Sequence, residues 1–170
     1  MASAISSAPF ATERGLTPIA PFFLAYSTAA IAVRLLGGAL PDRWGRRRIL
    51  WPSLMSLAIG LALIPHARQS SALLLMGTLG GIGHGYGFPV LSAMIVDRAR
   101  RDRRGMHIGL FTGFIDVGGV IAAPLLGLVA RGSGYGLMYR SSGAALFVVG
   151  TLLLIADWRM CARSRRGAGR

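Results

Sequence analysis

Long apolar stretches alternate with short basic breaks along this chain. A helix needs roughly 20 residues to cross about 30 Å of hydrocarbon, and five stretches approach or exceed that length. None shows the apolar–polar alternation of a strand, and in lipid only helices or closed barrels satisfy their own backbone groups. The pattern therefore predicts an all-α integral membrane protein with about five transmembrane helices. The helices are expected at residues 17–40, 49–65, 72–96, 108–130 and 136–156.

The predicted membrane domain covers residues 17–157. A polar segment, residues 1–16, precedes it and lacks the early positive cluster and short apolar core of a secretory signal, so no cleavage is expected. A basic tail, residues 158–170, follows it. A coiled coil or soluble bundle is the alternative for these helices, but their faces are apolar all round, whereas such bundles require a polar half.

The overall charge changes this picture less than its distribution does. The chain is 53% hydrophobic and 15% charged, yet it carries a formal net charge of +13. In a soluble protein this charge would suggest a nucleic-acid partner. Here every basic residue other than histidine is arginine, and the arginines collect between apolar runs instead of covering a water-exposed face. Nucleic acid is therefore not expected as a partner.

The arginines favour one side of the membrane. Because successive helices cross the membrane in opposite directions, alternate connecting segments lie on opposite sides of it. The arginine-poor side has only Arg14, Arg68 and Arg131, with Arg140 just inside the last helix. Such asymmetry in short loops places the arginine-rich side, with the C-terminus, in the cytoplasm, and predicts a multi-pass protein of the inner cell membrane. The arginine-rich segments contain Arg43, Arg46, Arg47 and Arg48; Arg98, Arg100, Arg101, Arg103 and Arg104; and Arg159, Arg163, Arg165, Arg166 and Arg170.

The first basic break, GALPDRWGRRRIL at residues 38–50, contains more than arginine. Gly38 permits close helix approach, and Pro41 is expected to end the first helix. Asp42 can pair with an arginine or lie at a helix N-terminus, and Gly45 permits a tight reversal. Spacing alone leaves a second interpretation open, in which the segment is a generic basic hairpin whose arginines only orient the chain.

This segment resembles the signature loop of the major facilitator superfamily of secondary transporters. Pro41 stands where alanine or serine is more usual in that family. The segment GHGYGFPVLSAMIVDRARRDRRGMHIGLFTGFIDVGGVIAAPLLG, residues 83–127, is similar to the family's tenth and eleventh helices, including an aspartate-containing helix that ends in Pro124. The matching loop positions are Gly38, Leu40, Asp42, Arg43, Trp44, Gly45, Arg46 and Arg47.

By this resemblance the five helices correspond to helices eight to twelve of a twelve-helix transporter, and the chain to most of a C-terminal half. The resemblance implies transport of a small solute by alternating access, coupled to protons, with Asp42, Arg43 and Arg46 as gating residues. The expected partners are the lipid bilayer, a small-molecule substrate, and either the missing N-terminal half or a second copy. The alternative is a truncated, non-transporting membrane protein or an accessory subunit that binds helices through its glycine faces.

Arg34 and Asp116 are charged side chains inside predicted helices, where a charge costs at least about 2.5 to 3.5 kcal/mol. Arg34 lies about 9 Å from the end of its helix and can reach the headgroups. Asp116, about 12 Å from its helix end, cannot, so it must be neutral, paired or in contact with water. A proton carrier and a structural hydrogen bond both remain open for Asp116. The two residues fall at similar depth, which would allow them to pair.

Three glycines, Gly77, Gly81 and Gly85, recur every four residues and predict a face for close helix packing. His84 and Tyr86 point away from this face and are candidates for lining a cavity, although a packing role for His84 stays open. The sequence contains no nucleophile elbow, phosphate loop, zinc-ligand spacing or carboxylate dyad. No enzymatic activity, cofactor or metal is therefore expected.

Overall fold

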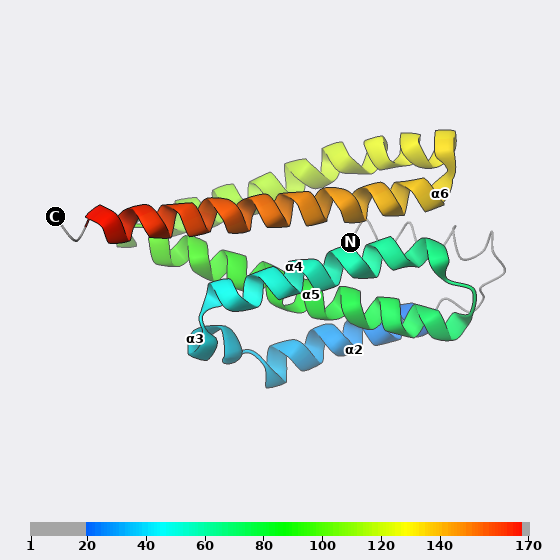
Figure 1. The fold of residues 1–170 in the computed structure, drawn as a ribbon, viewed down its shortest axis with the longest axis horizontal. Helices are drawn as coiled ribbons and strands as arrows, with labels where there is room; N and C mark the ends of the chain where they lie inside the picture. Colours follow the sequence, from blue (N-terminus) through cyan, green and yellow to red (C-terminus); the bar gives the residue numbers. More distant parts are fainter. Residues whose placement is uncertain (1–19, 168–170) are drawn as a thin grey trace.

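A computed structural model describes residues 20–167, and these residues form a bundle of helices without a strand. The predicted all-α membrane fold is confirmed. The predicted N-terminal segment, residues 1–16, lies outside the described residues. In chain order the elements are α2 (Ala20–Leu36), α3 (Leu40–Trp44), α4 (Arg46–Leu63), the 3₁₀ turn η1 (Ile64–His66), α5 (Ser70–Arg98), the 3₁₀ turn η2 (Arg101–Arg103) and α6 (Arg104–Gly167) (Figure 1).

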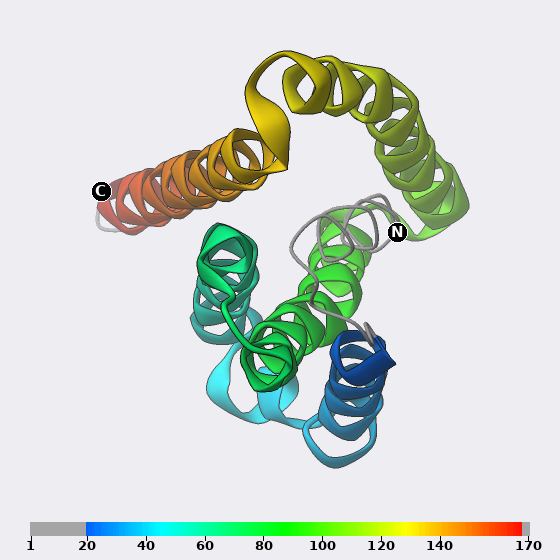
Figure 2. The ribbon, with the colours of Figure 1, turned by 90° about the vertical axis from the view of Figure 1, so that its right-hand side faces the viewer.

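The long α6 consists of two helical segments that meet at Gly134. This residue has φ 81° and ψ 161°, a conformation that glycine adopts and side-chain-bearing residues avoid. The chain reverses there, so that the first segment of α6, residues 104–133, and the second segment, residues 135–167, run in opposite directions (Figures 1 and 2). Together with α2, α4 and α5, the two segments give five long helices within residues 20–167.

Several of these helices have the length and hydropathy of membrane spans. The stretches that meet both requirements are Arg46–His66, Ser71–Arg98 and Arg101–Ala156, and the last contains most of both α6 segments. Ala20–Leu36 is apolar but shorter. Pro52, Pro89 and Pro124 lie inside helices, where neighbouring helices and local adjustments compensate for the missing N–H groups.

The helix ends differ in places from the predicted ones. α2 ends at Leu36, before Gly37 and Gly38, and Pro41 lies in the first turn of α3 instead of ending the first helix. Proline is well suited to that first turn because no intrahelical partner awaits its N–H group. The second segment of α6 continues to Gly167, past the predicted end at residue 156, through residues of good helix propensity such as alanine, arginine and methionine.

Helix α5 lies between α2 and α4, and glycines allow both neighbours to approach it closely (Figure 2). A Cβ atom at Gly81 would overlap the carbonyl oxygen of Tyr26 in α2. On another face of α5, a Cβ atom at Gly83 would lie 2.6 Å from the Cβ atom of Leu57 in α4. Gly143 plays the same part in the second segment of α6, where a Cβ atom would lie 2.9 Å from the carbonyl oxygen of Ala58.

The best-packed apolar cluster surrounds the connection between α4 and α5. It joins the start of α2, the end of α4, the start of α5 and the beginning of the second α6 segment, and Tyr139 is its most buried large side chain. Its buried members are Phe22, Ile64, Ala67, Leu73, Met76, Met138 and Tyr139. This cluster holds together the end of the molecule opposite to α3 (Figure 1).

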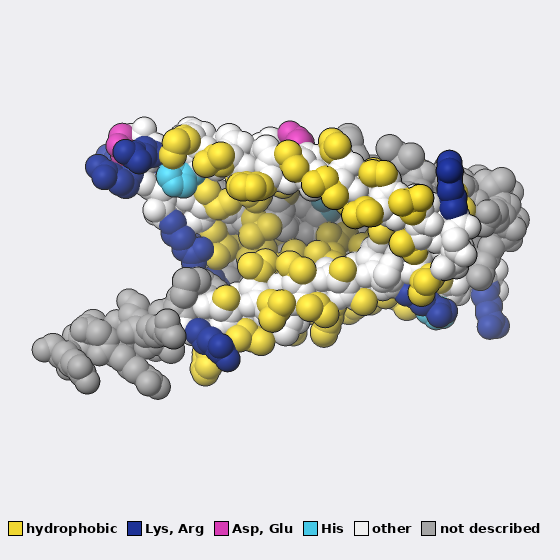
Figure 3. All heavy atoms as spheres, turned by 90° about the horizontal axis from the view of Figure 1, so that it is seen from above, with side chains coloured by type: hydrophobic (Ala, Val, Ile, Leu, Met, Phe, Trp, Pro, Cys, Tyr) yellow, Lys and Arg dark blue, Asp and Glu magenta, His cyan; other side chains and the backbone are white. Residues whose placement is uncertain are grey.

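The first segment of α6 contributes little to this packing. Most of its large apolar side chains are not covered by other parts of the chain; Phe114, for example, is 75% exposed. Figure 2 shows the segment standing apart from α2 and α4, and Figure 3 shows a hollow lined by apolar side chains between the two α6 segments. The bundle therefore leaves an apolar surface that lipid or another helix would cover.

Candidate functional site

Most described arginines of the basic segments gather at one end of the molecule. α3, the start of α4, the end of α5 and the start of α6 meet at this end (Figure 1), and Figure 3 shows basic side chains at both ends of an apolar surface. We call the end that contains α3 the charged end. The arrangement places residues 43–48 and 98–104 on the same side of the bundle, as the sequence asymmetry requires.

The hairpin at the charged end is built around two short-range features. Pro41 occupies the first turn of α3 and is buried, so α3 is anchored against the bundle. Gly45 then has φ 93° and ψ 128°, which separates the five-residue α3 from α4. Because only glycine adopts this conformation readily, Gly45 fixes the direction in which the arginines after it leave the hairpin.

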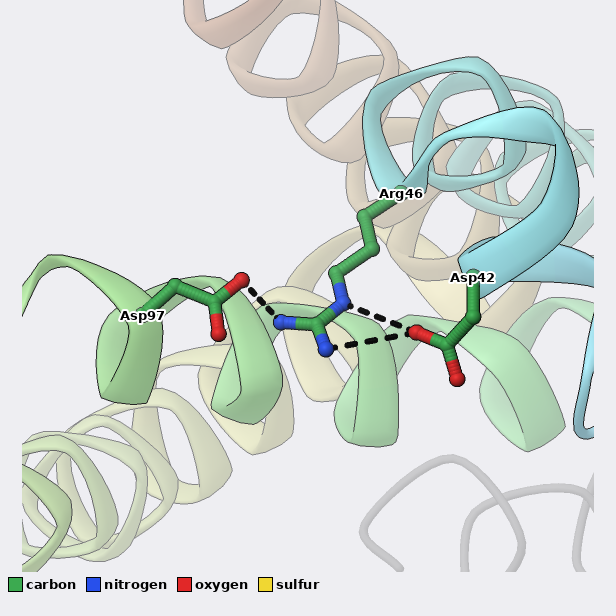
Figure 4. Close-up of polar contacts among 3 residues, drawn as sticks. All are labelled: Asp42, Arg46 and Asp97. Atoms are coloured by element: carbon green, nitrogen blue, oxygen red, sulfur yellow. Dashed lines mark hydrogen bonds and ion pairs between the residues drawn. The ribbon is translucent and has the colours of Figure 1, made fainter.

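Arg46 connects the hairpin to α5 through two carboxylates (Figure 4). Its Nε and Nη2 atoms donate to Oδ1 of Asp42 at 3.3 and 3.2 Å. Its Nη1 atom donates to Oδ2 of Asp97, which belongs to the last turn of α5. We call Asp42, Arg46 and Asp97 the charged triad. It joins the ends of α3 and α5 to the start of α4.

The charged triad is accessible to solvent, which limits how much its ion pairs stabilise the fold. The Arg46 side chain is 28% exposed, and the Asp42 and Asp97 side chains are 67% and 59% exposed. Exposed ion pairs contribute about 0.2 to 1 kcal/mol each, less at high salt. The triad can therefore form and break during a conformational change at modest cost, whereas a fully buried network could not.

A cavity of about 260 Å³ lies behind the triad, between α2, α3 and α5. Arg34 and Tyr86 line it together with Asp42 and Arg46. The Tyr86 side chain reaches the chain just after α2, since a Cβ atom at Gly37 would overlap its hydroxyl group. Two polar residues that the sequence places inside helices therefore lie next to the hairpin residues.

The other two predicted site residues, His84 and Asp116, are not among the residues that line this cavity. The His84 ring lies against Tyr26, with ring centroids 6.0 Å apart, and is half-buried. Asp116 is exposed, on the loosely packed first segment of α6. Among the described residues no ion pair joins Arg34 to Asp116, so the pairing that their similar depth would have allowed does not occur. Equal depth does not bring two side chains together when their helices lie apart.

The predicted glycine face lies against α2. Cβ atoms at Gly77 and Gly81 would overlap carbonyl oxygens of Phe22 and Tyr26, and one at Gly85 would lie 3.2 Å from Cα of Ala30. The closest approaches thus repeat every four residues along both helices. Such spacing is typical of helices that pack through small residues in lipid.

Sequence reasoning missed Asp97. It follows directly after Val96, where the third helix was expected to end, and it is a carboxylate within a segment of five nearby arginines. That contrast of charge was the available signal. Which arginine it would meet depended on how α5 ends beside α4, and no local pattern encodes that relation.

Comparison with known proteins supports these observations. The sequence profile of the Major Facilitator Superfamily matches residues 2–168. An uncharacterized MFS-type transporter from Salmonella typhimurium is 31% identical over 65% of this chain and 28% of its own length. Multidrug resistance protein 3 from Bacillus subtilis is 31% identical over 64% of this chain and 21% of its own length. Monocarboxylate transporter 13 from Rattus norvegicus is 30% identical over 88% of this chain and 36% of its own length.

The chain therefore spans between about a fifth and about a third of the length of these curated relatives. No solved structure matches it with significance.

Proposed function

Since this chain belongs to the Major Facilitator Superfamily, we propose that it is part of a secondary active transporter that moves a small solute by alternating access. Transporters of this kind bind their solute between two parts that rock against each other. The chain supplies one such part, a bundle whose first α6 segment and adjoining hollow remain uncovered. The second part is either a companion half or a second copy.

The observation that carries the proposal is the charged triad. Arg46 ties the hairpin to the last turn of α5, and Asp42 directs only its Oδ1 atom toward Arg46. The second oxygen of Asp42, on a side chain that is 67% exposed, is available to a donor from the opposing part of the transporter. Asp42 would thus join the two parts in one state and release them in the other.

The predicted gating loop consists of Gly38, Asp42, Arg43, Gly45, Arg46 and Arg47, and we add Asp97 to it. In this mechanism the loop residues bias a two-state equilibrium and do not contact the solute. A contribution of about 1 kcal/mol per ion pair shifts such an equilibrium about fivefold, which is enough to alter transport rates without preventing either state.

Asp116 is the residue that we propose for proton coupling. It is exposed on the first α6 segment, where the residues before and after it in the sequence are apolar. A carboxylate on an uncovered membrane helix must be neutral or face water, and exchange between these states moves a proton. The Arg34 and Tyr86 side chains line a separate cavity nearer the charged end, so we assign them to the gate.

The test is transport by the chain reconstituted in vesicles that enclose a pH-sensitive dye. Relatives are named for multidrug resistance, for sulfoacetate and for monocarboxylates, so suitable probes are ethidium, sulfoacetate and lactate. Solute-dependent proton movement that is lost in Asp116→Asn and kept in Asp102→Asn supports the proposal. Asp102 is the matched control because it is an exposed aspartate in the η2 turn at the charged end.

Failure of every probe with the chain alone would exclude a second copy as the second part; failure also after joining the chain to the N-terminal half of a relative, with the helices still assembled, would favour an accessory role. The exposed apolar side chains of the first α6 segment are the observation behind this second candidate. In that case the chain would bind other membrane helices through this segment without moving a solute.

A further inference from the structure

Two opposite charges on different helices have no counter-charge within the described part of the chain. Arg34 lies on α2 and Asp116 on the first segment of α6, and both residues are exposed. Among the side chains that the structure describes, none forms a hydrogen bond or an ion pair with either of them. An unpaired charge in hydrocarbon is costly, so each residue favours a partner of opposite charge outside the chain.

Arg34 belongs to a face of α2 that the bundle leaves uncovered. Members of this face follow one another at intervals of four and three residues, the spacing of a seam between packed helices, and every member is exposed. Its large apolar members, Leu24 and Ile31, are 69% and 56% exposed. The opposite side of α2 packs against the glycines of α5. The members are Ala20, Leu24, Ser27, Ile31 and Arg34.

Asp116 lies within a matching face on the first α6 segment. This face repeats with the same alternation of four and three residues, and all its members are exposed. Most members are small, and a Cβ atom at any of its three glycines would meet nothing within 4 Å. A second helix can therefore approach closely, as small residues permit in lipid. The members are Gly109, Gly113, Asp116, Val120, Ala123 and Gly127.

The two faces fit each other in direction and size. α2 runs toward the charged end and α6 begins at that end, so α2 of one copy and the first α6 segment of another copy in the same orientation are antiparallel (Figure 1). Let Arg34 stand opposite Asp116. In that register the large side chain of Leu24 falls opposite Gly127, which has none. Figure 2 shows both helices at the same side of the bundle, on either side of α5.

We propose that a second copy of this chain covers these faces, with Arg34 of each copy paired with Asp116 of the other. Both pairs form at once when a two-fold axis along the membrane normal relates the copies, because each copy then applies the same two faces. This symmetry also keeps the basic segments of both copies on one side of the bilayer. A companion of another sequence would need an acid and a base at matching depths, whereas a second copy supplies both.

The inference rests on the proposed function in one respect, since it names a second copy as the second part of the transporter. Association of the copies requires only a bilayer and no solute. Measuring association therefore separates this inference from the proposal of transport.

Charge reversal in two separately labelled copies tests the pairs. One copy carries Arg34→Asp, which makes both of its faces acidic, and the other carries Asp116→Arg, which makes both basic. Full-length chains with a donor or an acceptor fluorescent protein at the C-terminus are placed in phosphatidylcholine vesicles, and energy transfer is measured over a range of protein-to-lipid ratios. Each variant alone should associate at least about tenfold more weakly than the unsubstituted chain, because like charges meet. The mixture of the two variants should regain most of the association.

Cross-linking tests the register. Ser27 and Ala123 lie seven residues from the two charges, each on the side away from the charged end, so they should face each other across the interface. In a Cys161→Ala background, Ser27→Cys in one tagged copy should form a disulfide with Ala123→Cys in a copy with another tag. Leu125→Cys is the matched control, since this residue is also exposed but lies on the opposite side of its helix, and it should not cross-link.

Neutral variants keep the test valid if a charge-reversed copy fails to insert. Arg34→Gln and Asp116→Asn should each weaken association at least about fivefold, because every dimer loses two interhelical polar contacts. The double variant should be little weaker than either single one, since all remove the same pairs. Arg101→Gln with Asp102→Asn is the matched control, because it removes one charge of each sign from the exposed η2 turn. It should leave association unchanged.

Several results would overturn the proposal. Energy transfer no greater than random mixing gives for the unsubstituted chain would exclude the dimer. A mixture of the two reversed copies that associates no better than either alone, or a dimer that both neutral variants leave unchanged, would exclude the pairs. Solute flux without a dimer would refute this interface and leave transport standing. A dimer with the expected pairs and no flux would support the interface and count against transport by this chain alone.

Discussion

The packing of α5 against α2 gives the sharpest prediction about the fold. In Gly81→Ala the new Cβ atom would overlap the carbonyl oxygen of Tyr26 and lie 3.0 Å from the Cβ atom of Ala29. A backbone oxygen cannot rotate away as a flexible side chain can, so α2 must move as a whole. Overpacking of this kind costs about 1 to 3 kcal/mol.

A second glycine of α5 provides the matched control. A Cβ atom at Gly87 would have nothing within 4 Å. Replacing a helical glycine by alanine without a clash is neutral or stabilises by up to about 1 kcal/mol, because the unfolded chain loses conformational freedom. Gly81→Ala and Gly87→Ala should therefore differ by about 1 to 4 kcal/mol, which is at least about fivefold in the unfolding equilibrium constant.

The assay follows helix content by circular dichroism while SDS is titrated into dodecylmaltoside micelles that contain the purified chain. Gly81→Ala should unfold at a lower SDS mole fraction than the unsubstituted chain, and Gly87→Ala at the same or a higher one. If both variants unfold together, α2 does not lie against this face of α5, and the reasoning about the glycine spacing fails.

Two further predictions concern the hairpin. A double-mutant cycle of Arg46→Gln and Asp97→Asn in the same assay should give a coupling energy of about 0.2 to 1 kcal/mol. Because the pair is exposed, this coupling should decline with added salt. Zero coupling at low salt would show that the two side chains do not form an ion pair. Gly45→Ala should destabilise the chain by about 1 to 3 kcal/mol through backbone strain at φ 93°. Gly105→Ala, at a position with open space, should not destabilise it. Equal midpoints of SDS unfolding for the two variants would show that the hairpin does not require a positive φ.

The sequence predicts the helical class and the arrangement of charge well because both depend on local composition. Apolar stretches of sufficient length form helices in lipid regardless of their neighbours. The arginine-rich segments 43–48 and 98–104 likewise come to the same end because successive helices alternate in direction. Glycines that recur every four residues predict a packing face without naming the helix that covers it.

The remaining features depend on tertiary relations. Depth along a helix suggested that Arg34 and Asp116 could meet, but their lateral positions keep them from forming an ion pair within one chain. The partner of Arg46 on α5, Asp97, depends on helix ends that sequence patterns place only to within a few residues. The cavity that Arg34 and Tyr86 line needs α2, α3 and α5 to form. None of these relations has a signature within one helix.

The central claim is that the basic segments mark one aqueous side of a bilayer that the chain crosses repeatedly. Single cysteines tested in a Cys161→Ala background can be labelled with a membrane-impermeant maleimide. Trp44→Cys and Asp102→Cys should react in inside-out vesicles, and Gln69→Cys and Ser133→Cys in spheroplasts. Reaction of Trp44→Cys and Asp102→Cys from opposite sides of the membrane would contradict the account.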